Sequence, residues 1–259
     1  KRQDNSIMLP EITMMPSIPK LLTEVDIIFT MLPSGSVVKE IVNEFINNFN
    51  PKSTLIDCST IDVKTTIEVC QILGNKKINM LDAPVSGGVQ GAKSGSLTFM
   101  VGGSRDDFDK LRFLFEYMGS RSVYCGKNGS GQTAKICNNM ILGVTMIATC
   151  EAFVLADKLE LDREAMFDVV STSSGYSWSM NSYCPAPGVG PKAPSDNDYT
   201  PGFSSDLMLK DLTLSQNASS ESKASTPMGD LAMKLYKDFV ENKNGSGLDF
   251  SAIIKTFEV

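Results

Sequence analysis

The sequence predicts an α/β fold, in which a largely parallel sheet domain is joined by a long helix to an all-α domain. Two observations predict it. Short apolar runs alternate with helical patterns over the first half of the 259 residues, and after Gly126 only helical patterns remain. Strands that alternate with helices are typical of βαβ units, which build parallel sheets.

The first half contains the strands of the predicted sheet. We predict strands at residues 25–31, 54–57, 78–82, 97–101 and 122–124, and helices at about 36–47 and 62–73. Ligands of such sheets bind beyond the carboxyl ends of the strands. The residues that follow each strand are therefore the first candidates for a binding site.

The second half begins with one long helix, predicted over about residues 130–159. Its middle is apolar on most faces, which is typical of a helix enclosed by protein, here between two domains. Further helices are predicted near 163–171, 205–220, 228–242 and 249–257. Residues 183–202 hold five prolines and three glycines and predict a long ordered loop, a feature that is often functional. We place the domain boundary so that residues 1–127 form the sheet domain and 128–259 the helical domain.

The composition excludes several classes of protein. The chain has no histidine, which rules out Ser-His-Asp and Cys-His catalysis and His-ligated zinc, so we expect no metal site. The net charge of −6 and the absence of Lys/Arg runs argue against a surface that binds nucleic acid. The longest apolar stretch, residues 140–156, is interrupted by Glu151 and predicts a core helix with no membrane contact. Six cysteines without a C-x-x-C pair are typical of buried free thiols in a reducing compartment.

A turn after the third strand is the first candidate site. Ser86, Gly87 and Gly88 follow a buried strand, and two glycines can expose backbone N–H groups. Such a turn suits a small carboxylate, with the Ser86 hydroxyl as a further donor. A purely structural turn is the alternative interpretation.

Lys135 is the second candidate. Lys135 and Asn139 lie four residues apart and share one face near the start of the long helix. Apolar turns follow at once, so we expect the ammonium at a buried cleft, where desolvation lowers a lysine pKa from about 10.4 toward neutrality. A lysine that extends to solvent is the alternative. Leu32, Pro33 and Thr60 follow the first two strands and Lys210 lies on an amphipathic helix, positions that are ordinary when taken alone.

Six segments occur in an order that identifies a family. They are residues 30–33, 56–62, 82–88, 95–103, 131–139 and 203–212. Together they resemble the β-hydroxyacid dehydrogenase family over nearly the whole chain. The loop at residues 181–188, with Pro194, Ser195 and Tyr199, resembles the branch that acts on 3-hydroxyisobutyrate.

The resemblance implies a Rossmann-type sheet domain and NAD-dependent oxidation of 3-hydroxyisobutyrate to methylmalonate semialdehyde in valine catabolism, with NADP not excluded. It implies that Lys135 is the catalytic acid/base, that Asn139 helps to hold the substrate, and that Ser86, Gly87 and Gly88 bind the substrate carboxylate. The NAD site would be lined by Leu32, Pro33, Thr60 and Lys210. Trp178 matches an aromatic residue near the substrate pocket, with a core position as the alternative. A homo-oligomer (dimer or tetramer) and a location in the mitochondrial matrix are also implied.

One departure from the family concerns the start of the sequence. Family members open with a strand, a G-x-G-x-x-G turn, a helix and a strand that carries the ribose-binding acid. Here 24 residues precede Val25, and no glycine occurs before Gly35. We therefore expect a truncated Rossmann-type sheet that binds NAD poorly or not at all, because the pyrophosphate would lack its glycine turn and helix N-terminus. An NADPH-dependent glyoxylate or succinic semialdehyde reductase of the same family, or a non-catalytic oligomerising fragment, are the alternatives.

Overall fold

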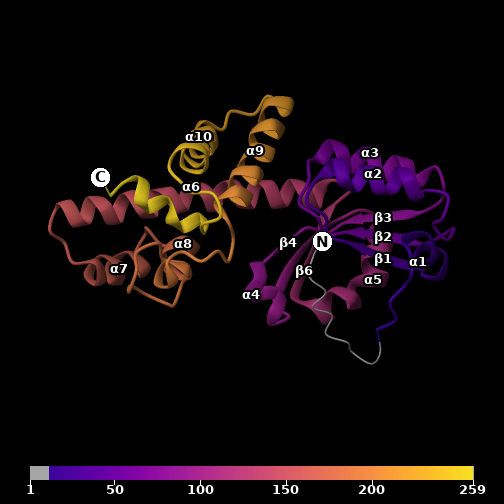
Figure 1. The fold of residues 1–259 in the computed structure, drawn as a ribbon, viewed down its shortest axis with the longest axis horizontal. Coiled ribbons are helices and arrows are strands. Elements are labelled where there is room, and N and C mark those ends of the chain that lie inside the picture. Colours follow the sequence, from indigo (N-terminus) through magenta and orange to yellow (C-terminus); the bar gives the residue numbers. More distant parts are fainter. Residues whose placement is uncertain (1–11, 259) are drawn as a thin grey trace.

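A computed structural model describes residues 12–258 of the chain. It contains a mixed α/β region and a helical region, and the long helix α6 (Ser130–Lys158) runs from one into the other (Figure 1). The α/β fold with an all-α second half, predicted from the sequence, is confirmed. The first eleven residues of the predicted sheet domain lie outside the described part.

The sheet has six strands within the described residues. They are β1 (Ile27–Thr30), β2 (Thr54–Asp57), β3 (Asn79–Asp82), β4 (Val85–Ser86), β5 (Leu97–Gly102) and β6 (Gly119–Gly126). Their order is β1-β2-β3-β5-β4, and β6 pairs with β5. The ladders β1–β2, β2–β3 and β5–β6 are parallel, whereas β5 runs antiparallel to β3 and β4. After β3 the chain stays extended and forms β4 along β5. The sequence pattern did not predict this short strand. The predicted turn therefore begins at the end of β4.

Helices cover both faces of this sheet. They are α1 (Ile18–Glu24), α2 (Gly35–Phe45), α3 (Val63–Gly74), α4 (Gly88–Lys93) and α5 (Arg105–Met118). Successive strand residues point to opposite faces. Leu55 of β2 packs in the core beneath α2 and α3, and Ile56 packs in the core against α5. The two helical layers thus explain why every residue of β2 is buried.

The helical region is built around the second half of α6. Its other elements are α7 (Arg163–Ser171), α8 (Trp178–Asn181), α9 (Ser205–Ser222), α10 (Pro227–Asn242) and the 3₁₀ helices η1 (Pro194–Asn197) and η2 (Phe250–Thr256). The predicted helix at 249–257 is therefore a 3₁₀ helix, and the predicted loop at 183–202 contains one. By length and composition α6 could cross a membrane, but Met146 and Phe153 belong to the core shared with α9, α10 and η2. We interpret α6 as a core helix.

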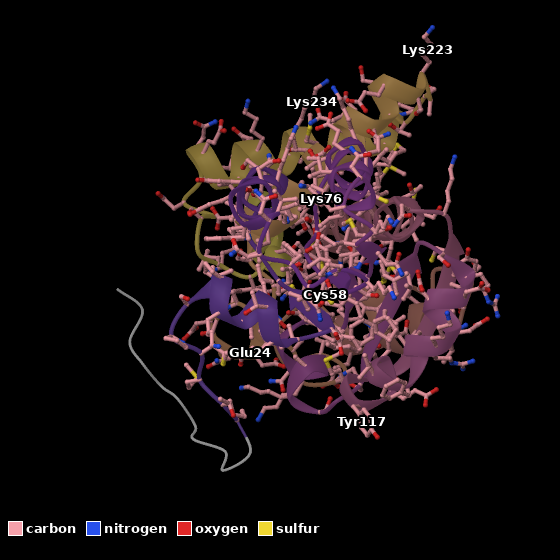
Figure 2. All side chains as sticks on the ribbon, turned by 90° about the vertical axis from the view of Figure 1, so that its right-hand side faces the viewer. Glu24, Cys58, Lys76, Tyr117, Lys223 and Lys234 are labelled. Carbon is pink, nitrogen blue, oxygen red and sulfur yellow. The ribbon has the colours of Figure 1, made fainter. Side chains whose placement is uncertain are left out.

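The cysteines are free, but they are not all buried as predicted. Cys58, Cys150 and Cys184 are buried, Cys70 and Cys125 are half-buried, and Cys137 is exposed. Figure 2 shows Cys58 in the interior, whereas Tyr117, Lys223 and Lys234 project from the periphery. Burial raises the pKa of the Cys58 thiol to about 12, so this thiol stays protonated and unreactive.

Candidate active site

The carboxyl ends of β1 and β2 are tied together by a buried carboxylate. Asp57, at the end of β2, accepts hydrogen bonds from the hydroxyls of Thr30 (2.8 Å) and Ser59 (2.6 Å). The Ser59 oxygen in turn accepts the backbone N–H of Leu32 at 2.8 Å. Burial raises the pKa of Asp57, and these hydrogen bonds oppose the rise. The loop that carries Leu32 and Pro33 is thereby fixed beside the end of β2.

A second buried carboxylate fixes the start of α6. Asp82, at the end of β3, accepts the backbone N–H groups of Gly129 (2.8 Å) and Gln132 (3.1 Å), and so caps α6 from another element. Burial raises the pKa of Asp82, and these N–H groups oppose the rise. The Gln132 amide also donates to the carbonyl of Ser59 at 2.7 Å. The first turn of α6 is therefore attached to the ends of β2 and β3.

Lys135 lies one turn further along α6 and is buried, with 7% of its surface exposed. Desolvation lowers the pKa of its ammonium, the charge of Asp211 opposes this, and Lys210 adds to the lowering. Among the described residues, none accepts a hydrogen bond from it or forms an ion pair with it. The buried position predicted for Lys135 is confirmed, and a solvent-extended lysine is wrong. That this position lies in a cleft stays a prediction.

Asp211 of α9 organises the surroundings of Lys135. It is buried and accepts a hydrogen bond from the Asn139 amide at 2.5 Å, and its other oxygen lies 3.2 Å from the Lys210 ammonium. Lys210 also donates to the backbone carbonyl of Thr60 at 2.9 Å. The structure thus brings together Lys135, Asn139, Lys210 and Thr60.

Sequence reasoning missed Asp211 and considered only Lys210 of this amphipathic helix. The available signal was an acid on the apolar side of the helix: Asp211 lies next to Leu212, and both Met208 and Leu212 are fully buried. An acid on the buried side of a helix requires polar partners.

The Ser86–Gly88 turn lies at a different part of the same domain junction. Ser86 pairs with Thr98 of β5, and Gly87 and Gly88 have φ of 126° and 60°, which favour glycine. A Cβ added to Gly88 would lie 3.7 Å from the carbonyl oxygen of Gly202. The turn therefore faces the loop of the helical region. No hydrogen bond within residues 12–258 joins it to Lys135 or Asn139.

Trp178 is not a core residue, because half of its surface is exposed. Its ring stacks on Tyr183, with centroids 4.9 Å apart and planes inclined by 22°. Of the two interpretations of Trp178, the core position is therefore wrong.

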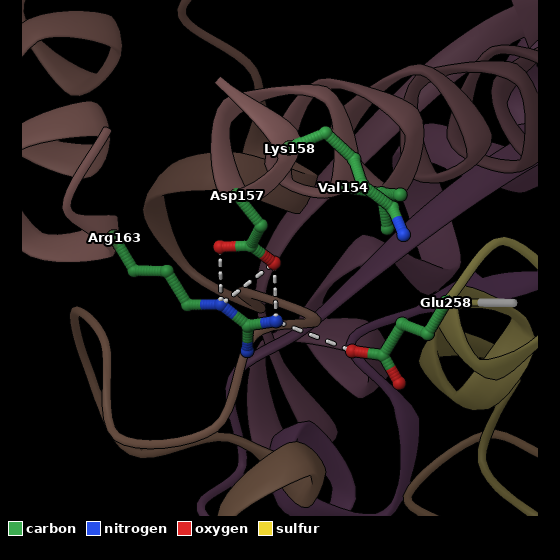
Figure 3. Close-up of a pocket in the computed structure, with 5 residues that line it drawn as sticks. All are labelled: Val154, Asp157, Lys158, Arg163 and Glu258. Atoms are coloured by element: carbon green, nitrogen blue, oxygen red, sulfur yellow. Dashed lines mark hydrogen bonds and ion pairs between the residues drawn. The ribbon is translucent and has the colours of Figure 1, made fainter. Parts of the chain in front are cut away.

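A cavity lies at the opposite end of α6. It has a volume of about 320 Å³ and is lined by Val154, Asp157, Lys158, Arg163 and Glu258 (Figure 3). Arg163 binds the Asp157 carboxylate through two nitrogens and contacts Glu258 at 3.2 Å. Lys135 and Asp157 are roughly 33 Å apart along the helix, at about 1.5 Å per residue. Asp157, Arg163 and Glu258 pair with one another at this end, whereas Lys135 has no partner among the described residues.

A sheet whose strand ends lie beside a buried lysine of a helical region suits a nicotinamide-dependent oxidoreductase, and two family matches support this class. Residues 2–126 match the family described as the NAD binding domain of 6-phosphogluconate dehydrogenase. Residues 129–257 match the family described as NAD-binding of NADP-dependent 3-hydroxyisobutyrate dehydrogenase.

Relatives with established names agree with these matches. The chain is 42% identical over 240 residues to a probable 3-hydroxyisobutyrate dehydrogenase of Mycobacterium tuberculosis, covering 93% of this chain and 81% of the relative. It is 42% identical to a mitochondrial 3-hydroxyisobutyrate dehydrogenase of Mus musculus, covering 89% and 69%. A solved structure of the M. tuberculosis 3-hydroxyisobutyrate dehydrogenase with L-serine has a TM-score of 0.90 at 41% identity, covering 95% and 84%. The chain belongs to the β-hydroxyacid dehydrogenase family, and the relatives favour a dehydrogenase over the alternatives that the sequence left open.

Proposed function

We propose that the chain oxidises 3-hydroxyisobutyrate to methylmalonate semialdehyde with NAD, as a step in valine catabolism. The observation that carries this proposal is the buried Lys135, which has no partner among the described residues and lies beside Asn139 and Asp211. A general base needs a pKa near the working pH and free access to the substrate proton. Lys135 has a lowered pKa and an unoccupied amino group.

Lys135 acts as the acid/base of the reaction. In the oxidative direction its neutral amine accepts the proton of the substrate hydroxyl. In the reductive direction its ammonium stabilises the developing alkoxide and returns the proton. Asn139 is held by Asp211 at 2.5 Å and orients the substrate beside Lys135. The substrate carboxylate binds at Ser86, Gly87 and Gly88.

The cofactor site is formed by Leu32, Pro33, Thr60 and Lys210. The residues fit a dinucleotide because they stand at the carboxyl ends of β1 and β2, and because buried Asp57 and Ser59 fix the Leu32 loop there. The bound nicotinamide supplies the chemistry of hydride transfer. The proposed domain division at residues 127 and 128 places this site in the sheet domain, with Lys210 reaching it from the helical domain.

A substrate panel tests the proposal. 3-Hydroxyisobutyrate, L-serine, glyoxylate and succinic semialdehyde would be assayed with the NAD and NADP couples. We expect 3-hydroxyisobutyrate with NAD to give the highest kcat/KM. L-Serine is the second candidate substrate, because it accompanies the solved relative and is itself a 3-hydroxy acid. A preference for glyoxylate with NADPH would contradict the proposal.

Self-association into a dimer or tetramer through α6 is part of the proposal. Ile141 and Leu155 of α6 are each 60% exposed, and Leu159, which directly follows α6, is 72% exposed. Apolar side chains exposed along one helix support an interface with a second copy of the chain. Light scattering after gel filtration measures the mass, and Leu155→Glu should lower it. A monomeric wild type would refute this part.

We also propose a location in the mitochondrial matrix, which is supported by the name of the mouse relative, a mitochondrial enzyme. The mycobacterial relative is equally similar, so fractionation of the source cells is the deciding measurement.

A further inference from the structure

Asp249, the residue before η2, is a buried carboxylate that the mechanism above does not use. It is 0% exposed, and no ion pair to it occurs among residues 12–258. Five hydrogen bonds satisfy it, with these donors: the Tyr183 hydroxyl (2.8 Å), the N–H groups of Gly202 (3.0 Å) and Phe203 (3.1 Å), and the N–H (3.0 Å) and hydroxyl (2.7 Å) of Ser251. We call Asp249 and the four residues that donate to it the Asp249 cluster. A buried carboxylate is tolerated only with such bonding, so the cluster fixes three separate segments of chain.

Gly202 connects the Asp249 cluster to the Ser86–Gly88 turn. Its carbonyl oxygen lies 3.7 Å from the place of a Cβ on Gly88. A Cβ on Gly202 itself would lie 2.6 Å from the Tyr183 hydroxyl, closer than real side chains approach. The N–H of Gly202 is thus bound by Asp249, its Cα lies beside the Tyr183 hydroxyl, and its carbonyl oxygen lies near Gly88 of the turn.

Tyr183 extends the cluster to the exposed aromatic residue. Its ring lies between Trp178 (centroids 4.9 Å apart) and Phe250 (5.3 Å). Burial and the charge of Asp249 raise the pKa of the Tyr183 phenol, which therefore keeps its proton and remains a donor. The orientation of this aromatic stack depends on the same carboxylate that holds Gly202.

We propose that Asp249 is a positioning residue for the substrate site: it fixes Gly202 and Tyr183 against the Ser86–Gly88 turn and thereby sets the affinity for the hydroxy acid. The proposal rests on the function given above, in which that turn binds the substrate carboxylate. Asp249 touches neither Lys135 nor the cofactor residues, so its effect falls on substrate binding.

The first test separates KM from kcat. In Asp249→Asn the new amide NH₂ must face some of the five donors, and KM for 3-hydroxyisobutyrate should rise about tenfold, equivalent to one lost buried hydrogen bond. The change in kcat should be smaller, and the Kd for NAD should not change. Asp206→Asn is the matched control, because Asp206 accepts from Ser246 (2.9 Å) and Gly247 (2.8 Å) without contacting Gly202.

A second pair of variants covers the case in which Asp249→Asn does not fold. Gly202→Ala places a methyl group on the Tyr183 hydroxyl and should raise KM in the same way. Adding Tyr183→Phe removes that oxygen and should restore KM toward the wild-type value. A folded Gly202→Ala protein whose KM stays within about twofold of wild type would overturn the proposal.

Hydrogen–deuterium exchange tests the positioning role without turnover. Asp249→Asn, or Gly202→Ala in its place, should speed exchange at residues 202–203 and also at 86–91, whereas Asp206→Asn should affect 246–247. Faster exchange at residues 202–203 with unchanged exchange at residues 86–91 would overturn the proposal. Faster exchange at both segments, in a chain that oxidises no 3-hydroxy acid, would support the positioning role and contradict the proposed function.

Discussion

The charged side chains at the two ends of α6 differ in burial and in ion pairing. At its first turns Lys135 is buried, has no partner among the described residues, and has a lowered pKa. At its last turns Asp157 accepts hydrogen bonds from Nε and one terminal nitrogen of Arg163, whose side chain is 30% exposed, and the pKa of Asp157 is lowered. The acids and Arg163 that line the cavity at the second end satisfy one another. The comparison teaches that a desolvated, incompletely paired group is a better candidate for chemistry than a set of charges that are fully paired.

Removing the lysine should give the largest effect. Lys135→Ala deletes the proton acceptor, and we expect kcat to fall by about 10²–10⁴-fold, the usual contribution of a general acid/base. Steady-state kinetics with NAD and 3-hydroxyisobutyrate measure it. Lys158→Ala is the matched control at the other end of α6 and should leave kcat unchanged. A loss of less than about threefold in Lys135→Ala would remove Lys135 from the catalytic role.

Asp211→Asn should give an intermediate effect. The amide oxygen can still accept from Asn139, so mainly the charge is lost. Asp211 raises the pKa of Lys135, so its neutralisation lowers that pKa further. Lys135 must be neutral for oxidation, and the rising limb of the kcat/KM profile should therefore move to lower pH. Asp230→Asn, in an exposed pair with Lys234, is the control. A rising limb of the Asp211→Asn profile that stays at the wild-type pH, or moves to higher pH, would contradict this account.

Stability should respond to Lys135 in the opposite direction from activity. Lys135→Met removes a buried, unpaired ammonium and should raise the free energy of unfolding by about 1 kcal/mol at neutral pH. The folded-state pKa of Lys135 is lowered, so between it and the unfolded value the unfolded chain binds more protons. Wild-type stability then rises with pH, and the advantage of Lys135→Met shrinks toward pH about 10.4. Urea unfolding of both proteins across this range checks it, and a constant difference would argue against a lowered pKa.

The far end of α6 should give the smallest effect. Asp157→Asn breaks a largely exposed ion pair and should cost no more than about 1 kcal/mol of stability, with kcat and KM unchanged. Because the pKa of Asp157 is lowered, its contribution is present above the ordinary aspartate pKa and is lost as pH falls through the folded value. Thermal melts at neutral and acidic pH measure this, and a change in kcat would mean that the two ends are coupled.

The sequence predicted the parts of this molecule that depend on local pattern. Strand and helix positions followed from periodicity, and the absence of histidine directed attention to Lys135. Contacts between distant segments could not be predicted in this way. Asp82 caps α6 from 47 positions away, Asn139 meets Asp211 across 72, and Tyr183 meets Asp249 across 66. Local spacing carries no information on such pairs. The amphipathic helix α5 was also left unassigned, although Phe108 and Phe115 on its inner face are buried.

The cap on α6 has a consequence for how the protein folds. Gly129, at the start of the helix, offers no side chain to its own first turn, and the acceptor comes from Asp82 in β3. The first turn of α6 therefore gains this cap only when β3 is in its place in the sheet, and the position of Lys135 depends on long-range contacts. A chain whose sheet has not formed would present a frayed helix end and an exposed, ordinary lysine, so partly folded molecules would be inactive without any separate control.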